Sequence, residues 1–324
     1  MSSKLLSYTA LGLILGNTAF ADVPKVAVDI APVHSLVSRV MEGVGTPELV
    51  IPAGASPHGY SLRPSEAKAL QDADMVIWMG EDLAPWMENS IETLSKNADV
   101  ITLLEESETK LLDFREGALF EEHDHGDHDD HDDHDDHDDH DDHDDHGDHD
   151  EHAHGEHDPH AWLSIENAQT WLNLVAGKLS AADPENAGVY FANAAEARAE
   201  IDALVKEVNS ILEPVRGRNF VVFHDAYQYF ETSFDFPAAG AISLGDASDP
   251  SAARIAEIQD RVKDEGINCV LSEPQYNPNL VATVLSGTDA KTGVIDPLGA
   301  SLEPGSNLYG DLIRNMAKSL AGCL

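Results

Sequence analysis

Positive charge is scarce in this sequence of 324 residues. Only 19 lysines and arginines face 60 aspartates and glutamates, which gives a formal net charge of −41 at pH 7. Residues 121–158 hold 21 of the acidic residues and no lysine or arginine, yet removing their charge still leaves −20. Because proteins contact phosphates mainly through lysine and arginine, this composition argues against binding to nucleic acid and to anionic lipid.

Apolar runs long enough to cross a bilayer, which takes about 20 residues, are also lacking. The chain begins with a basic residue at Lys4, a short apolar run at Leu11–Leu15 and the small-x-small ending Ala19-Phe20-Ala21. These features are typical of a secretory signal peptide, and we expect cleavage after Ala21. A membrane anchor is the alternative, but the apolar run is short and interrupted. We therefore expect a soluble mature protein outside the cytoplasm.

Cysteine is rare, with only Cys269 and Cys323 in the whole chain. An exported protein meets oxidising conditions, so we expect the two to form a disulfide, although two separate buried thiols would also fit the sequence. Closing a loop of this size would stabilise the fold by roughly 4 kcal/mol on the chain-entropy estimate.

Apolar strand-like runs alternate with amphipathic helical segments on both sides of the acidic stretch. Strands that are apolar throughout and separated by helices indicate parallel sheets covered on both faces. We expect an α/β protein with two parallel-sheet lobes, at residues 22–183 and 214–324, joined by a long rigid helix at 184–213. A disordered loop is expected at 117–158. The predicted strands are 23–30, 48–51, 73–79, 98–104, 219–223, 239–244, 268–271 and 293–295, and the predicted shorter helices are 33–41, 64–71, 83–94, 251–265, 279–285 and 308–320.

Histidine is concentrated in a repeat of His-Asp-Asp triplets, which contains 13 of the 17 histidines. The repeat has almost nothing apolar to bury and its charges repel one another, so we expect it to be disordered without metal. Imidazoles suit zinc, copper and nickel, and we interpret the repeat as a set of weak auxiliary metal sites; a solvated acidic spacer is the alternative. Its near-equivalent ligands define no single geometry, so metal selectivity must arise elsewhere. The histidines are His123, His125, His128, His131, His134, His137, His140, His143, His146, His149, His152, His154 and His157.

Four histidines lie outside the repeat, and three of them occupy positions expected of a binding site. His58 lies in a loop just past a predicted strand, His160 follows the repeat, and His224 ends a predicted strand. Asp296 ends another strand. Ligands of open α/β sheets bind beyond the carboxyl ends of strands, so these four side chains are predicted to converge in the cleft between the lobes. His34, at a predicted helix start, is interpreted as a structural residue.

Three imidazoles and one carboxylate form a nearly tetrahedral set of ligands, which suits Zn²⁺ well and Mn²⁺ less well. Each histidine taken alone would more often be a hydrogen-bonded structural residue. Their joint placement favours a metal site.

Four motifs surround these residues and resemble the metal-specific solute-binding proteins of ABC importers, most of all the zinc-uptake members of ZnuA type. The resemblance implies a periplasmic protein with two lobes, a metal held between them by His58, His160 and His224, and a membrane permease as partner. It covers essentially the whole mature chain. The motifs are Gly-Ala-Ser-Pro-His-Gly-Tyr-Ser-Leu-Arg-Pro-Ser at 54–65, Asp-Pro-His-Ala-Trp-Leu-Ser at 158–164, Val-Phe-His-Asp-Ala-Tyr-Gln-Tyr-Phe-Glu at 222–231 and Ser-Glu-Pro-Gln at 272–275.

The chain departs from this family pattern in ways that bear on the metal. Some zinc members have an acidic residue immediately before the first histidine, where this chain has Pro57, which cannot ligate. The fourth ligand is therefore Asp296, a water or a histidine of the repeat. Manganese members use carboxylates at both later positions, whereas this chain has His224, which favours zinc. Glu273, at the end of a strand, is predicted to orient a ligating imidazole.

Two other classes of protein compete with a zinc receptor. A zinc hydrolase also uses three protein ligands, but it needs a positioned base and a substrate pocket. The sequence has no His-Glu-x-x-His helix, Gly-x-Ser-x-Gly turn or glycine-rich phosphate loop. A histidine-rich metal store is the third possibility. We expect a monomeric, non-enzymatic receptor that captures zinc and passes it to a permease.

Overall fold

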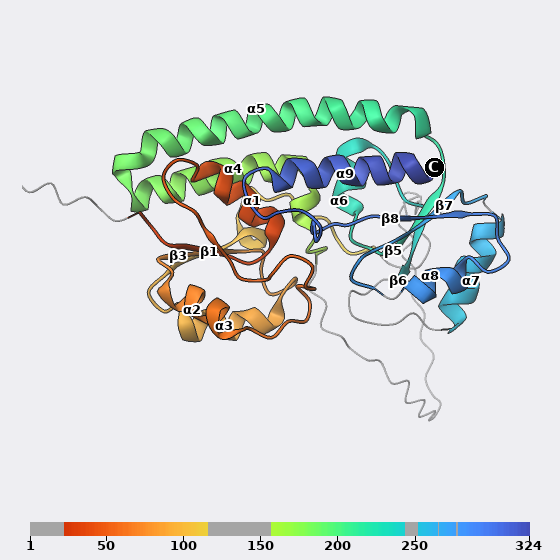
Figure 1. Ribbon diagram of the computed structural model, residues 1–324, viewed down its shortest axis with the longest axis horizontal. Coiled ribbons are helices and arrows are strands. Elements are labelled where there is room, and N and C mark those ends of the chain that lie inside the picture. The colour runs from red at the N-terminus through yellow and green to blue at the C-terminus, as the bar shows by residue number, and fades with distance from the viewer. Residues whose placement is uncertain (1–22, 116–156, 244–251, 265, 277) are drawn as a thin grey trace, which may run out of the picture.

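The computed structural model describes residues 23–115, 157–243, 252–264, 266–276 and 278–324 (Figure 1). The expected signal peptide and twelve of the thirteen repeat histidines lie outside these residues. The disordered loop is predicted to end at residue 158, but residues 157 and 158 are part of the fold. His157 pairs with Asp113 in an antiparallel bridge, and Asp158 is buried.

Two four-stranded parallel sheets form the centres of the two lobes, which confirms the expected fold class (Figure 1). The strand orders are β2-β1-β3-β4 and β6-β5-β7-β8, so both sheets follow the same topology. β3 and β5 are buried along their whole length, which explains why these runs are apolar at every position. The strands are β1 (Val26–Val28), β2 (Glu48–Leu49), β3 (Met75–Trp78), β4 (Asp99–Thr102), β5 (Phe220–His224), β6 (Gly240–Ser243), β7 (Cys269–Ser272) and β8 (Lys291–Val294).

The helices begin at residues suited to a first turn. Proline opens α2 and α3, and the Ser164 hydroxyl accepts the N–H of Asn167 at the start of α4. α4 and α6 lie where the sequence pattern predicted no element. Within the described residues, none of the helices combines the length and apolar character needed to cross a membrane. The helices are α1 (Ala31–Val40), α2 (Pro64–Asp72), α3 (Pro85–Leu94), α4 (Ile165–Ala182), α5 (Ala187–Leu212), α6 (Gln228–Phe234), α7 (Ala252–Asp264), α8 (Pro278–Val284) and α9 (Leu308–Cys323), with 3₁₀ turns at Leu103–Glu105, Ala161–Leu163, Pro184–Asn186 and Glu213–Val215.

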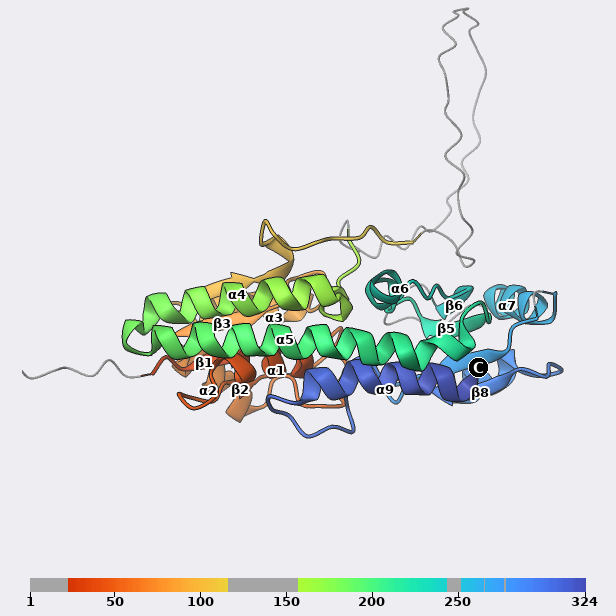
Figure 2. The same cartoon turned by 90° about the horizontal axis from the view of Figure 1, so that it is seen from above.

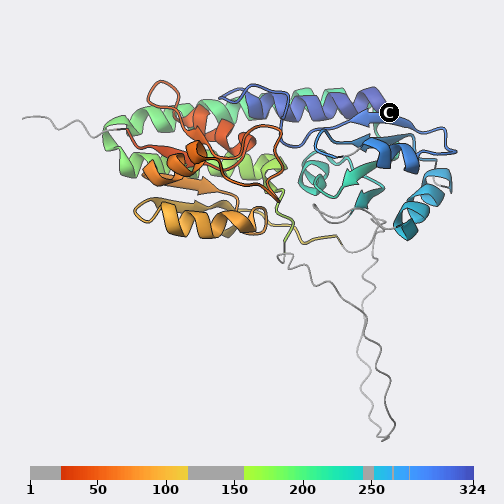
Figure 3. The same cartoon turned by 60° about the horizontal axis from the view of Figure 1, so that its bottom comes forward.

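A layer of helices runs along both lobes, with α5 spanning them and α4 and α9 packed beside it (Figure 2). One continuous hydrophobic core lies between this layer and the two sheets. It includes Val28 and Ile77 of the first sheet, Phe220 and Leu271 of the second, and Leu204 of α5. Smaller cores lie under α2 and α3 in the first lobe and under α7 and α8 in the second (Figure 3). The lobes therefore share the largest core of the molecule.

α9 connects the lobes a second time. At its start, the backbone N–H of Tyr309 donates to the Ser35 hydroxyl of α1, and the Tyr309 hydroxyl donates to the carbonyl of Trp162. At its end, Cys323 forms a disulfide with Cys269 of β7, which confirms the expected pairing. Rotation of one lobe about α5 would therefore have to break contacts of α9 as well.

A carboxyl group is buried at the carboxyl end of β1. Asp29 is 0% exposed, and its two oxygens accept the backbone N–H groups of Ile30 and Met79, which ties the ends of β1 and β3 together. Burial raises the pKa of Asp29 to about 7, and the N–H donors oppose this only in part. The folded chain therefore keeps a proton on Asp29 at pH values where the unfolded chain has lost it.

Asp29 makes the stability of the fold depend on pH. Between about pH 4 and about pH 7 the folded state binds a proton that the unfolded state has lost. The contribution of Asp29 to the free energy of unfolding is therefore greatest below pH 4. It decreases as the pH rises toward 7, by at most about 4 kcal/mol in total. Asp29→Asn cannot titrate. The free energy of unfolding is measured in urea, without metal, for the wild type and for Asp29→Asn. The wild-type value minus the Asp29→Asn value should fall between about pH 4 and pH 7 and be constant above pH 7. A difference that is flat from pH 4 to 8 would contradict the raised pKa.

Candidate metal centre

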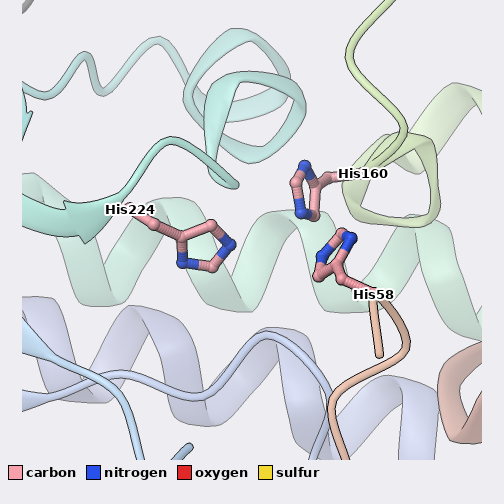
Figure 4. Close-up of side chains that lie close together, drawn as sticks. All are labelled: His58, His160 and His224. Carbon is pink, nitrogen blue, oxygen red and sulfur yellow. The ribbon is translucent and has the colours of Figure 1, made fainter. Parts of the chain in front are cut away.

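Three histidines that are distant in the sequence meet between the lobes (Figure 4). His58, His160 and His224 each offer a ring nitrogen, and these nitrogens all lie within 4.8 Å of one another. Nitrogens bound to one zinc at ~2.1 Å in tetrahedral geometry are about 3.4 Å apart, so small rotations of the rings would close the site. Among the described residues, this is the one group of three or more metal-ligating side chains at such spacing.

His58 lies in the loop between β2 and α2, and this loop is held from both sides. The indole N–H of Trp86 donates to the carbonyl of Pro57 at 2.7 Å. Tyr60 packs edge-on against Trp86 and donates its hydroxyl to Glu66 in the first turn of α2. His58 itself is half-buried, so of the three rings it is the most accessible to solvent.

His160 is oriented by a buried carboxylate two residues before it. Asp158 accepts both the backbone N–H of His160, at 2.9 Å, and its ring nitrogen Nδ1, at 2.7 Å. A carboxylate can only accept, so the proton lies on Nδ1 and the lone pair of the neutral ring is on Nε2. This role of Asp158 was not predicted from the sequence, although the Asp-Pro-His pattern brings the two side chains close in the chain.

His224 is oriented in the same way from a neighbouring strand. It ends β5, and β5 pairs with β7 in parallel, which brings Glu273 just past the end of β7 beside it. The Glu273 carboxylate lies 2.5 Å from Nδ1 of His224, and both side chains are buried. This contact leaves Nε2 of His224 with the lone pair, and the role of Glu273 toward a bound metal stays a prediction.

Asp296 is not a member of the three-histidine group. It lies two residues past the end of β8, where its Oδ1 accepts the N–H groups of Leu298 and Gly299 and its Oδ2 accepts that of Ala300. Both oxygens therefore stabilise the turn that follows β8. Its role as a metal ligand stays a prediction.

The remaining histidines of the folded part have local partners. His34 is buried in α1, where Nε2 contacts the carbonyl of Pro47 at 3.0 Å, as expected of a structural residue. His157 contacts Asp113 at the base of the histidine repeat and is partly exposed. The other repeat histidines are not described by the structure.

The cavity at the three histidines is small. It measures about 20 Å³, whereas one water needs ~10–15 Å³, so an ion and at most one small ligand fit. Burial raises the pKa of nearby Tyr227 well above its usual value, and the charge of Glu273 adds to this, so that phenol stays neutral. The cavity is lined by Ser56, Pro57, His58, His160, Trp162, His224, Glu273, Gln275, Tyr276, Pro297 and Leu298.

A buried ion pair joins the base of the histidine repeat to the second lobe. Arg115, the last residue described before the repeat, donates to Asp225, which follows His224, and to Glu231 of α6. Both carboxylates are 5% exposed. Burial raises the pKa of Asp225, and the guanidinium of Arg115 acts in the opposite direction.

Comparisons with known proteins agree over nearly the whole chain. The family model described as "Zinc-uptake complex component A periplasmic" (ZnuA) matches residues 26–323. The high-affinity zinc uptake system protein ZnuA of Paracoccus denitrificans (strain Pd 1222) is 49% identical over 322 residues, covering 98% of each chain. The protein of the same name from Brucella abortus (strain 2308) is 46% identical over 329 residues, covering 100% of this chain and 98% of its own. A solved structure described as the crystal structure of ZnuA matches with a TM-score of 0.72 at 20% identity, covering 93% of this chain and 99% of its own.

The fold is therefore that of two-lobed binding proteins in which a long helix joins two α/β lobes. Because the family model covers nearly the whole chain and two relatives are almost half identical, the chain belongs to the ZnuA family of periplasmic zinc-uptake components.

Replacing Arg115 should leave two buried carboxylates unpaired. We expect Arg115→Met to lower the free energy of unfolding by about 3–5 kcal/mol at pH 7, and by less at pH 5, because protonation then relieves the unpaired charges. Arg39→Met is the matched control, since the glutamate partners of Arg39 are all more than half exposed, and it should cost less than about 1 kcal/mol. Chemical denaturation of both variants at the two pH values tests this; equal losses would refute a special role of burial at Arg115.

Proposed function

We propose that this protein is a periplasmic receptor that captures Zn²⁺ with high affinity and delivers it to the membrane permease of an ABC importer. The observation that carries the proposal is the convergence of His58, His160 and His224 within bridging distance of one ion. Zinc is the cargo of the site. The names of the curated relatives and the family description support the same metal and the same compartment.

The chemistry of the site favours zinc. Imidazole nitrogen is a good ligand for Zn²⁺, whereas Mn²⁺ prefers oxygen ligands and a larger coordination number. A cavity of about 20 Å³ has no space for the additional waters that six-coordination would require. Asp158 and Glu273 each carry a negative charge one hydrogen bond away from a ligating ring, and together they balance the two charges of the ion.

The same features support a receptor without catalytic activity. An enzyme needs room for an organic substrate next to the metal and a base that is free to take a proton. The cavity has room only for a small ligand, and the carboxylates beside it are engaged, Asp158 and Glu273 by imidazoles and Asp296 by backbone N–H groups. We further propose that the protein acts as a monomer, since each copy of the chain supplies the three imidazoles by itself.

The histidine repeat supplies weaker sites in this proposal. Its imidazoles and carboxylates attract divalent cations, but the repeat offers many similar ligand sets in place of one. Tight and selective binding is therefore assigned to the cavity, and collection of additional ions to the repeat. Asp296, a water and a repeat histidine are the three candidates for the fourth ligand.

Loss of any of the three imidazoles should weaken tight zinc binding by at least about 100-fold. We expect this for His58→Ala, His160→Ala and His224→Ala, because each leaves only two protein ligands, and competition with a chelator of known affinity measures it. His157→Ala, which removes a histidine outside the cavity, is the control and should keep the wild-type affinity. The receptor assignment fails if all three cavity variants bind zinc as the wild type does.

Removal of the repeat should separate the two kinds of site. A chain that lacks residues 121–154, joined by a short Gly-Ser linker, should retain one tight zinc and lose the weaker ones. This deletion leaves the contact between His157 and Asp113 in place. Calorimetric titration with independent metal analysis gives the stoichiometry. Loss of the tight site on deletion would assign that site to the repeat.

A further inference from the structure

The three-histidine group leaves one position of a tetrahedral zinc unfilled, because zinc in such sites takes four ligands. Pro57, next to His58, has no side-chain donor atom. Asp296 accepts three backbone N–H groups with its two oxygens, and it does not belong to the three-histidine group or line its cavity. Asp158 and Glu273 are bound to the far nitrogens of two rings. The fourth position thus needs a different explanation.

Gln275 lies in the loop after β7, two residues from Glu273. It lines the cavity together with the three histidines, and both polar atoms of its side chain, Oε1 and Nε2, are buried. Among the described residues, neither atom has a hydrogen-bond partner. A buried polar group without a partner costs about 1–3 kcal/mol, so an amide in this state indicates a polar occupant of the cavity.

We propose that Gln275 holds a water molecule in the fourth coordination position of the bound ion. This inference rests on the proposed function, because it concerns the same site. A single water can give one lone pair to the cation, donate a proton to Oε1 and accept a hydrogen from Nε2, which satisfies both ends of the amide at once. Direct ligation by Oε1 would leave Nε2 buried without an acceptor. The cavity volume allows one such water beside the ion.

The neutral amide makes Gln275 a residue that determines which metal is bound. The ion, Asp158 and Glu273 already sum to zero charge, so a neutral fourth group keeps the buried site neutral. A glutamate at this position would add an unbalanced negative charge and a hard oxygen ligand, which Mn²⁺ prefers more strongly than Zn²⁺ does. A neutral amide also cannot take a proton from the bound water, as a hydrolytic site would require.

The test compares Gln275→Leu and Gln275→Glu with the wild type in zinc affinity, in zinc-to-manganese preference and in the visible spectrum of the Co²⁺-loaded protein. For Gln275→Leu we expect one zinc per chain, an affinity about 10-fold or more lower, and an altered Co²⁺ spectrum. Gln275→Glu should recover zinc affinity but reduce the preference for zinc over manganese. Gln169→Leu, which changes a half-buried glutamine of α4 outside the cavity, should match the wild type.

The outcomes separate this inference from the receptor assignment. If Gln275→Leu binds zinc with wild-type affinity and an unchanged Co²⁺ spectrum, the role of Gln275 is overturned, while the receptor assignment still depends only on the histidine variants. A zinc-loaded crystal structure of the wild type gives an answer that needs no variant to fold. A water bound to zinc and hydrogen-bonded to Gln275 supports the proposal. Asp296, Gln275 or a repeat histidine within ~2.2 Å of the ion overturns it.

Discussion

The shared hydrophobic core is the constraint on which the proposed metal site depends. His58 and His160 come from the first lobe and His224 from the second, so the distance between their rings is set by how the lobes pack. The core under α4, α5 and α9 touches both sheets, and α9 ties α1 to β7 through Tyr309 and the disulfide of Cys323. Two connections and one core leave little freedom for the lobes to separate. The ligands are thus positioned before the ion arrives, which lowers the ordering cost of binding.

Buried negative charge lies next to the three histidines that are proposed to bind the cation. An isolated carboxylate inside a protein is costly, and such groups are retained only when they are paired. Asp158 and Glu273 are paired with imidazoles in the absence of metal, and binding of a dication between those imidazoles then compensates both charges. These carboxylates also select the tautomer that directs Nε2 toward the ion. The permanent positive charge of Arg115 compensates the buried charges of Asp225 and Glu231.

Local patterns in the sequence were sufficient for most of the architecture. Runs such as the one at β3 are apolar at every position because both faces of the sheet are covered, and this property is visible without a structure. The three histidines could be recognised because each lies near a motif or at the end of a predicted strand. The short α6 and the contact between Arg115 and Asp225 were not recognisable, since both depend on packing between segments that are far apart in the sequence. Asp296 also shows what a sequence cannot reveal. Its position was predicted to within two residues of the strand end, but the hydrogen bonds from the following backbone to its oxygens were not predictable.

The proposed selectivity for zinc follows from geometry more than from composition. The histidine repeat contains more than four times as many imidazoles as the cavity, yet its near-equivalent His-Asp-Asp units define no single set of ligands. The cavity offers three imidazole nitrogens in fixed positions. Asp158 and Glu273 hold the Nδ1 atoms of His160 and His224, and Trp86 anchors the loop that carries His58. An ion that requires more ligands or longer bonds would have to expand a space of about 20 Å³ bounded by the shared core. Such an expansion would disturb the packing of both lobes and so lower the stability of the fold. The choice of metal is therefore coupled to that stability.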